Sequence, residues 1–231
     1  MSARVELSVV IPALFESENL RLLLPDLRSC LDGLEIVWEV LVIDGGSDDG
    51  TDEVVQRCDM ICVTEPVPGY GLAVLRGFRE AKGEYVLTMD ADLSHPTMFI
   101  QHMWDARNSA SLVIASRYVA GGGAEQHWFR AVLSRILNGL FQKGFSLPYG
   151  DLSSGFRLYE TQVVQALSPM HTNFVMLIEL VLLLQRAGHT IIEIPFFYEP
   201  RRSGASKARI LRFGKDYLRL FFHMGALRRL K

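Results

Sequence analysis

The sequence predicts an α/β protein with a mostly parallel sheet and helices on both of its faces. Short runs of apolar, β-branched residues alternate with amphipathic segments through the first 115 residues, and this alternation is typical of βαβ units. The runs are apolar at nearly every position, which suits strands that are covered on both faces. With 231 residues, 49% of them apolar, the chain can bury the core of one such domain.

Strands are expected where an apolar run stops at a turn signal. Residues 7–11 stop at Pro12, and residues 37–43 stop at a cluster of Asp, Gly and Ser residues. The other expected strands are residues 60–64, 85–89, 112–115 and 190–197. Because ligands of parallel sheets bind beyond the carboxyl ends of the strands, we expect the site there. The segments that this rule selects are 12–18, 44–49, 90–94 and 116–123.

Helices are expected where apolar residues recur at a spacing of three or four. The first lies in the segment 18–34, where this pattern runs, and is expected to end at Gly33. Thr51 or Asp52 is expected to cap the next helix, which begins near Glu53. The other expected helices are residues 71–81, 97–108, 128–143, 161–167 and 173–187, and a long one from residue 208.

Residues 208–231 are expected to form a basic amphipathic helix that follows a domain of residues 1–207. Residues 201–231 hold ten Lys or Arg residues and one acidic residue, although the net charge of the whole chain is only −2. The apolar stripe of this helix comprises Ile210, Phe213, Tyr217, Leu220, Phe221, Met224 and Leu227, with Arg209, Arg212, Lys215 and Arg219 beside or opposite it. The stripe fits the surface of an anionic membrane. Alternatively, it packs on the domain or on a second subunit.

The composition excludes several classes of protein. The near-zero net charge argues against a general nucleic-acid binder. Three cysteines, Cys30, Cys58 and Cys62, are too few for a disulfide framework. The chain starts directly with a strand pattern, so we expect no signal peptide, and no apolar window is long enough to span a membrane. These features indicate a cytoplasmic protein with reduced thiols.

Asp90, Ala91 and Asp92 directly follow the expected strand 85–89. Two carboxylates at the end of a buried strand repel each other unless something offsets their charge. A Mg²⁺ or Mn²⁺ ion bound together with a diphosphate would do so, because these ions prefer oxygen ligands. The alternative is a solvated turn with two unrelated acids. The position after a strand favours the first interpretation, with Asp90 and Asp92 as metal ligands.

Asp44 ends the second expected strand and precedes a run of Gly, Ser and Asp residues. Glycines such as Gly45 let the backbone approach a flat ligand, and a carboxylate at a strand end can accept hydrogen bonds from a nucleobase or a ribose. The same residues would also serve an ordinary turn into a helix. The segment lacks the GxGxxG and GxxxxGK[ST] patterns, which argues against dinucleotide and ATPase phosphate loops.

Several segments in order along the chain resemble family 2 glycosyltransferases of the GT-A fold. They are VVIP at residues 9–12, ESENL at 16–20, VIDGGSDDGT at 42–51, GYGLA at 69–73 and GEYVLTMDADLSHP at 83–96. Further segments are similar to the dolichyl-phosphate mannose synthase branch of that family. These are SRY at 116–118, GGG at 121–123, SR at 134–135, DLSSGFRLY at 151–159 and GASK at 204–207.

The resemblance implies roles for individual residues. Nine residues match positions that hold the nucleotide-sugar and its metal: Pro12, Glu16, Ile43, Asp90, Ala91, Asp92, Arg117, Arg201 and Lys207. Asp44 and Gly45, in the turn after the second strand, are also expected to bind the donor. Arg117, Arg130 and Ser134 match positions that grip the phosphate of the acceptor, and arginine suits phosphate oxygens. Asp92 would be the principal metal ligand and, with Arg117, would carry catalysis.

The chain also departs from that branch. Asn is usual where Phe15 stands, an aromatic ring at Leu14, a second Asp at Gly45 and a longer side chain at Ser94. In the branch, the Asp at the position of Gly45 helps to recognise the base of the donor nucleotide. The donor is therefore expected to be GDP-mannose in the first place and a UDP-sugar in the second.

The implied reaction moves a hexose to a polyprenyl or dolichyl phosphate, with the enzyme peripheral at the cytoplasmic face of the membrane. A lipid phosphate is an anionic nucleophile at neutral pH, so it needs no general base, and one in-line displacement inverts the anomeric carbon. Glu179, set in an apolar helix, is expected to anchor a loop or, with a hydroxyl acceptor, to act as a base. A degenerate module that docks on membranes without turnover is the alternative from another class.

Overall fold

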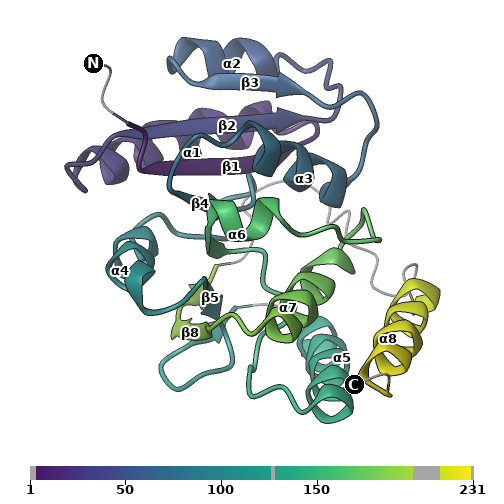
Figure 1. The fold of residues 1–231 in the computed structure, drawn as a ribbon. Coiled ribbons are helices and arrows are strands. Elements are labelled where there is room, and N and C mark those ends of the chain that lie inside the picture. The colour runs from purple at the N-terminus through teal and green to yellow at the C-terminus, as the bar shows by residue number, and fades with distance from the viewer. Residues whose placement is uncertain (1–3, 126–127, 200–213, 230–231) are drawn as a thin grey trace.

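The computed structural model describes residues 4–125, 128–199 and 214–229. Its centre is a seven-stranded sheet with the order β3-β2-β1-β4-β7-β5-β8 (Figure 1). The strands are β1 (Leu7–Ala13), β2 (Trp38–Asp44), β3 (Ile61–Thr64), β4 (Tyr85–Thr88), β5 (Leu112–Ser116), β7 (Arg157–Glu160) and β8 (Ile191–Pro195). Neighbouring strands run parallel, except that β7 is antiparallel to both β4 and β5. The predicted α/β class with a mostly parallel sheet is confirmed.

The sheet differs from the sequence prediction in two places. Residues 157–160 form β7, although no strand was expected there, because the charged Arg157 and Glu160 leave only two apolar residues between them. The predicted strand 190–197 is divided into β8 and the short β9 (Phe197–Tyr198). β9 pairs with β6 (Gly123–Ala124) in a separate two-stranded sheet. The division follows Pro195, which has no N–H to continue a ladder.

Helices cover both faces of the sheet (Figure 1). They are α1 (Ser17–Asp32), α2 (Thr51–Arg57), α3 (Tyr70–Glu80), α4 (Phe99–Asp105), α5 (Trp128–Phe145), α6 (Thr161–Gln165), α7 (Met176–Ala187) and α8 (Gly214–Arg229). The predicted helix 97–108 is shorter than expected, since a 3₁₀ turn, Arg107–Ser109, follows α4. The other helices predicted up to residue 187 begin and end within a few residues of the observed ones, whereas the start predicted at residue 208 lies outside the described residues.

Two apolar clusters lie on opposite faces of the sheet, and alternate residues of β1 point into each. Val10 belongs to the cluster under α3, α5, α7 and α8, whereas Val9 and Ile11 belong to the cluster under α1, α2 and α4. Successive side chains of a strand point to opposite faces, so both faces of β1 are buried. This double burial explains why the strands read as continuous apolar runs.

Helix α8 packs on the domain through the apolar stripe that the sequence predicted. Tyr217, Leu220 and Met224 are buried in the cluster that includes Phe141 of α5, and the Phe141 ring meets those of Tyr217 and Phe221 edge to face. The packing alternative is therefore confirmed for this part of the stripe. Ile210, Phe213, the side chain of Leu227 and the boundary predicted between residues 207 and 208 lie outside the described part of the chain. Among the helices of the described ranges, none is long and apolar enough to cross a membrane.

Candidate functional site

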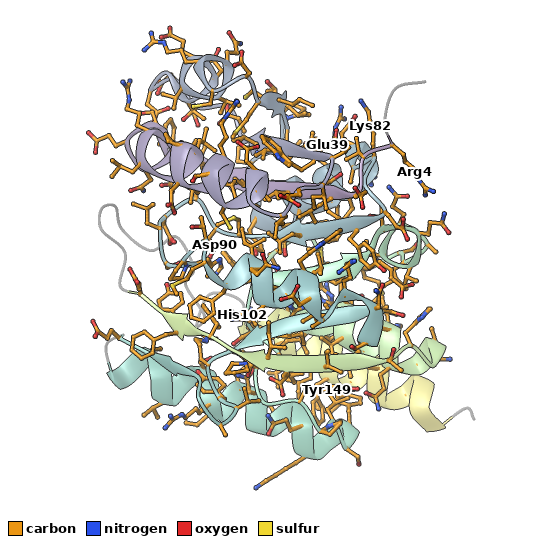
Figure 2. All side chains as sticks on the ribbon, turned by 90° about the vertical axis from the view of Figure 1, so that its left-hand side faces the viewer. Arg4, Glu39, Lys82, Asp90, His102 and Tyr149 are labelled. Carbon is orange, nitrogen blue, oxygen red and sulfur yellow. The ribbon has the colours of Figure 1, made fainter. Side chains whose placement is uncertain are left out.

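A cavity of about 640 Å³ opens at the carboxyl ends of the parallel strands. Figure 2 shows Asp90 at this end of the sheet, while Arg4, Glu39 and Lys82 lie at the other end. The lining residues are Pro12, Ala13, Leu14, Glu16, Gly45, Glu65, Val67, Pro68, Gly69, Tyr70, Leu72, Ala73, Asp90, Ala91, Asp92, Thr172, Asn173 and Phe174. The cavity therefore lies at the strand ends and includes residues of three of the four segments that the strand rule selected, 12–18, 44–49 and 90–94.

The structure brings most of the predicted donor-binding residues together. Those that line the cavity are Pro12, Glu16, Gly45, Asp90, Ala91 and Asp92. Ile43 and Asp44 are buried and are not among the lining residues. Arg117 belongs to a neighbouring cluster, described below, and Arg201 and Lys207 lie outside the described residues.

The segment after β4 presents two carboxylates, and its conformation is fixed by hydrogen bonds. The Asp92 side chain is buried, and its Oδ1 accepts hydrogen bonds from the backbone N–H and the hydroxyl of Ser94. The backbone N–H of Asp90 donates to Nδ1 of His95 at 2.9 Å. The buried His95 ring stacks on Phe156, with 4.9 Å between the ring centres. His95, for which the sequence predicted no catalytic role, thus holds the segment that carries Asp90 and Asp92.

Asp90 and Asp92 suit a divalent cation that is shared with a substrate. No group of three or more His, Cys, Asp or Glu side chains in the described ranges forms a metal cage. Mg²⁺ commonly binds one or two carboxylates and completes its shell with water and substrate phosphates. Two carboxylates that line a cavity fit that pattern, so the residues present fit a metal–diphosphate site.

The polar groups of the turn after β2 form hydrogen bonds within this turn and with the turn after β1. The Asp44 carboxylate accepts hydrogen bonds from the N–H and the hydroxyl of Ser47. Ser47 Oγ in turn accepts the N–H of Phe15 at 2.8 Å, which ties this turn to the one after β1. Asp44 therefore stabilises the turn, as in the ordinary-turn alternative, and leaves Gly45 to face the cavity.

Phe15 has a left-handed backbone conformation, with φ 53°, and its ring is 53% exposed. Asn is enriched in this conformation, and bulky residues are rare in it. This backbone geometry gives a physical reason for the Asn that the resembling branch carries at the position. The Phe15 ring is not among the lining residues of the cavity.

The loop before α7 forms one wall of the cavity, through Thr172, Asn173 and Phe174. Phe174 stacks on Tyr70 of α3, with 4.1 Å between ring centres and 14° between planes. Buried Glu179 holds this loop, because it accepts hydrogen bonds from the backbone N–H groups of Met170 and His171 and lies 2.8 Å from Nδ1 of His171. The loop-anchoring interpretation of Glu179 is confirmed.

Helix α8 also contacts this wall. Asn173 Nδ2 donates to Asp216 Oδ2 of α8 at 2.8 Å. On the other side of the loop, α3 approaches so closely that a Cβ on Gly71 would lie 2.4 Å from the carbonyl carbon of Thr172. The wall is thus fixed between α3, α7 and α8.

Arg117 follows β5 and forms a buried ion pair with Asp151. Its Nε and Nη2 lie 2.7 Å from Oδ2 and Oδ1 of Asp151, and its backbone N–H donates to Oδ2. Nη2 also donates to Ser153 Oγ at 3.1 Å. Nη1 makes no hydrogen bond with the part of the chain that the structure describes, so its two N–H groups can serve an anion.

The electrostatics of this pair favour two charged groups. Burial by itself would lower the pKa of Arg117 and raise that of Asp151. Their attraction and hydrogen bonds outweigh burial, so the pKa of Arg117 is raised and that of Asp151 is lowered. Arg117 is consequently a permanent cation with a fixed orientation.

The predicted acceptor residue Ser134 lies in the same cluster. Its hydroxyl is 3.0 Å from that of Ser153, which also accepts a hydrogen bond from Nη2 of Arg117. The guanidinium of Arg135 lies 5.5 Å from the centre of the Tyr118 ring, which Arg117 also faces at 5.1 Å. α5 carries Arg130 one turn before Ser134, and its side chain is outside the described part. The structure thus gathers two arginines and two hydroxyls.

Sequence reasoning missed Asp151, Ser153 and Glu193. Glu193 of β8 accepts the N–H groups of Gly150 and Asp151, which holds the loop that carries the carboxylate. The signal for Asp151 was its place at the head of the DLSSGFRLY segment, but the sequence does not show that it pairs with Arg117, 34 residues away. Such a pairing depends on β5 and β7 being neighbours in the sheet.

Comparison with known proteins identifies the family. The model of glycosyl transferase family 2 matches residues 8–168, which is more than half of the chain. The chain belongs to glycosyl transferase family 2. The matched region of this family 2 chain includes the Asp90–Asp92 segment, Arg117 and Asp151.

Curated relatives of this family 2 chain include two dolichol-phosphate mannosyltransferases. The protein from Pyrococcus furiosus is 32% identical over 95% of this chain, and that from Saccharomyces cerevisiae is 29% identical over 88%. An undecaprenyl-phosphate 4-deoxy-4-formamido-L-arabinose transferase from Edwardsiella ictaluri is 27% identical over 89%. The chain spans 64% of the length of the first of these relatives, 63% of the Edwardsiella protein and 81% of the yeast protein.

Solved structures share the fold. Glucosyl-3-phosphoglycerate synthase from Mycobacterium tuberculosis, in complex with Mn²⁺, UDP-glucose and phosphoglyceric acid, superposes with a TM-score of 0.78. The alignment covers 96% of this chain and 80% of that one at 18% identity. The same enzyme in complex with Mg²⁺ and UDP gives a TM-score of 0.75 at 20% identity. The predicted GT-A fold is confirmed.

Proposed function

We propose that this chain is an inverting glycosyltransferase that moves a hexose from a nucleoside-diphosphate sugar to a polyprenyl phosphate. The observation that carries the proposal is that the segment 151–156 contacts both the strand that leads to Asp90 and Asp92 and the cation Arg117. On one side Gly155 O accepts the hydroxyl of Thr88, just before Asp90 and Asp92. On the other side Asp151 holds Arg117. A carboxylate pair for a metal diphosphate thus lies two strands away from a cation for a second phosphate.

The donor would bind in the cavity, with its diphosphate at Asp90 and Asp92. A Mg²⁺ or Mn²⁺ ion held by these carboxylates would offset the negative charge that develops on the departing nucleoside diphosphate. His95 and Ser94 keep the two carboxylates in place by their hydrogen bonds to this segment. The Mn²⁺ and Mg²⁺ complexes of the structural relatives support the metal assignment.

The acceptor phosphate would lie against Nη1 of Arg117, near Ser134 and Arg130. An anionic phosphate oxygen attacks the anomeric carbon, the bond to the diphosphate oxygen breaks, and the configuration inverts. No proton has to be removed, since the nucleophile is already anionic. Glu179 is engaged with the loop at residues 170–171, which argues against its use as a base.

GDP-mannose is the favoured donor, because two of the relatives are dolichol-phosphate mannosyltransferases. A UDP-sugar is the second candidate, which the UDP complexes of the more distant structures support. The lipid acceptor is supported by all three relatives, whose names specify dolichol phosphate or undecaprenyl phosphate.

Such an acceptor requires contact with a membrane surface, at its cytoplasmic face by our proposal. Helix α5 exposes Val132, Ile136 and Leu140 at intervals of four, and α8 exposes Leu218 and Phe222 at the same interval. The two helices pack side by side (Figure 1). Lys143 of α5 and Lys215 and Arg219 of α8 are also exposed. Apolar side chains flanked by cations suit an anionic lipid surface.

The test is a transfer assay with a panel of nucleotide-sugars, a short polyprenyl phosphate and Mg²⁺ or Mn²⁺. The proposal predicts a labelled glycolipid from GDP-mannose that disappears in Asp92→Ala. Transfer by Asp92→Ala at the normal rate would overturn the metal assignment. If nucleotide binds but no donor is used, the chain is a non-catalytic docking module.

A further inference from the structure

Several lining residues of the cavity belong to the segments beside the ends of β2 and β3. They are Gly45 after β2 and Glu65 and Val67 after β3, with Leu14 beside Gly45 and Leu72 in the following helix α3. We call this part of the cavity its β2–β3 end. Since β4, β1, β2 and β3 are successive neighbours, it lies about 10–14 Å from the end of β4 at about 4.8 Å per strand. If the diphosphate binds after β4, this end receives the nucleoside.

Two features suit this end to a flat ring. The side chains of Leu14, Val67 and Leu72 provide apolar walls. Gly45 adds no side chain beside Leu14, where a Cβ would lie 3.4 Å from Cδ1 of Leu14. A nucleobase has two apolar faces and a polar edge, so it needs such walls together with one polar partner.

Glu65 provides that partner and is held in a defined position. Its backbone N–H donates to the carbonyl of Asp44 at 2.8 Å, which fixes it at the end of β3. Its Oε1 accepts the N–H of Val67 at 3.2 Å, while Oε2 accepts no hydrogen bond from the described residues. Glu16 also lines the cavity, but its Oε2 accepts the side-chain amide of Asn19 at 2.7 Å, at the start of α1.

A carboxylate at this position discriminates between bases. Guanine has two adjacent donors on one edge, N1–H and the N2 amino group, and a carboxylate can accept both in a bidentate contact. Uracil has a single donor, N3–H, between two carbonyl oxygens, so the second carboxylate oxygen would face a carbonyl. Repulsion of the wrong base adds to attraction of the right one.

We propose that Glu65 reads the guanine edge and makes the site selective for guanosine diphosphates over uridine diphosphates. The inference rests on the proposed function, because it takes the cavity as the donor site. It concerns recognition of the base and requires neither turnover nor a particular sugar.

The test is a calorimetric titration with GDP, inosine diphosphate and UDP in the presence of Mg²⁺. Inosine diphosphate keeps N1–H but lacks the N2 amino group, so the comparison with GDP measures the contribution of the N2 hydrogen bond. The wild-type protein is expected to bind GDP at least about tenfold more tightly than either of the other nucleotides. Glu65→Gln is expected to lose this preference, since its amide N–H₂ would face donors of guanine, while its affinity for UDP stays unchanged or rises.

Glu84→Gln is the matched control. Glu84 is exposed and precedes β4 at the opposite end of the sheet, so the variant removes the same charge and should bind like the wild type. Thermal unfolding checks that both variants fold. If the wild type does not discriminate, or if Glu65→Gln keeps the wild-type ratio of GDP to UDP affinity, the inference is wrong and the proposed function stands. If no nucleotide binds to the wild type, the proposed function and the inference are both wrong.

Discussion

The carboxylate of Asp151 holds the guanidinium of Arg117 in one orientation. Asp151 is completely buried, and both of its oxygens accept hydrogen bonds from Arg117. The guanidinium then presents Nη1 to an incoming anion. Removal of one partner from a buried pair leaves the other charge without compensation, at a cost of about 3–5 kcal/mol.

Asp151→Asn should therefore lower the free energy of unfolding by about 3 kcal/mol and raise the KM for the lipid phosphate. Urea unfolding and steady-state kinetics measure the two effects. Asp105→Asn, an exposed position on α4, is the control and should change neither. Equal unfolding of the two variants would show that the ion pair contributes nothing.

The same pair sets the response of stability to acid. Because the pKa of Asp151 is lowered by folding, its contribution is complete above the ordinary Asp pKa of about 3.9. It is lost as the pH falls through the lower pKa of the folded state. The stability difference between the wild type and Asp151→Asn should stay constant from pH 7 to about 5 and shrink only in stronger acid. A difference that shrinks already between pH 7 and 5 would contradict the lowered pKa.

Residue types and strand ends were enough to predict part of the site. Asp90 and Asp92 stand out because two acids follow a buried strand. Arg117 and Ser134 were expected only from the resemblance, and the structure shows that they share Ser153 as a neighbour. Glu65 was not predicted, because it becomes a cavity residue only when β3 lies at the edge of the sheet beside β2.

At the scale of elements, the cavity wall depends on the close approach of α3 to the loop before α7. A Cβ on Gly71 would lie 2.4 Å from the backbone of Thr172, so Gly71→Ala must displace this loop and the Phe174 ring that stacks on Tyr70. We expect nucleotide binding to weaken by about tenfold, or about 1.4 kcal/mol, as measured by titration.

Gly139→Ala is the matched control for that substitution. A Cβ on Gly139, inside α5, would meet nothing within 4 Å, so the change should stabilise the helix by about 0.5–1 kcal/mol and leave nucleotide binding unaltered. If Gly71→Ala binds nucleotide as tightly as Gly139→Ala does, the loop does not shape the site.

Elements with clear periodicity were predictable from the sequence, and those defined by their neighbours were not. The five strands with apolar runs in the first half of the chain were expected within two residues of their observed ends. β7 has two charged residues among four, and its pairing with β4 and β5 exists only in the folded chain. The pattern of burial, not propensity, makes this segment a strand.

At the scale of the whole molecule, the structure changes which side chains are available to a membrane. The described members of the predicted α8 stripe, Tyr217, Leu220, Phe221 and Met224, pack against the apolar cluster that includes Phe141 of α5, while Leu218 and Phe222 remain exposed. The net charge of −2 does not indicate this arrangement, because it is the sum of an acidic N-terminal part and a basic C-terminal segment.

The exposed positions are testable by sedimentation with anionic liposomes. The double variant Leu218→Gln and Phe222→Gln should bind about tenfold more weakly, because it loses apolar contact with the bilayer. Met98→Gln, exposed on the loop before α4, is the control and should sediment like the wild type. Added salt should weaken binding through Lys215 and Arg219. Equal sedimentation of both variants would place the membrane contact elsewhere.

The central claim is that a lipid phosphate displaces a nucleoside diphosphate from a sugar at this site. The most direct measurement is the NMR structure of the glycolipid formed from an α-linked donor and a polyprenyl phosphate. The account predicts a β-linked sugar attached through the phosphate of the lipid. An α-linked product, or a failure to form any glycolipid with a complete donor panel, would contradict it.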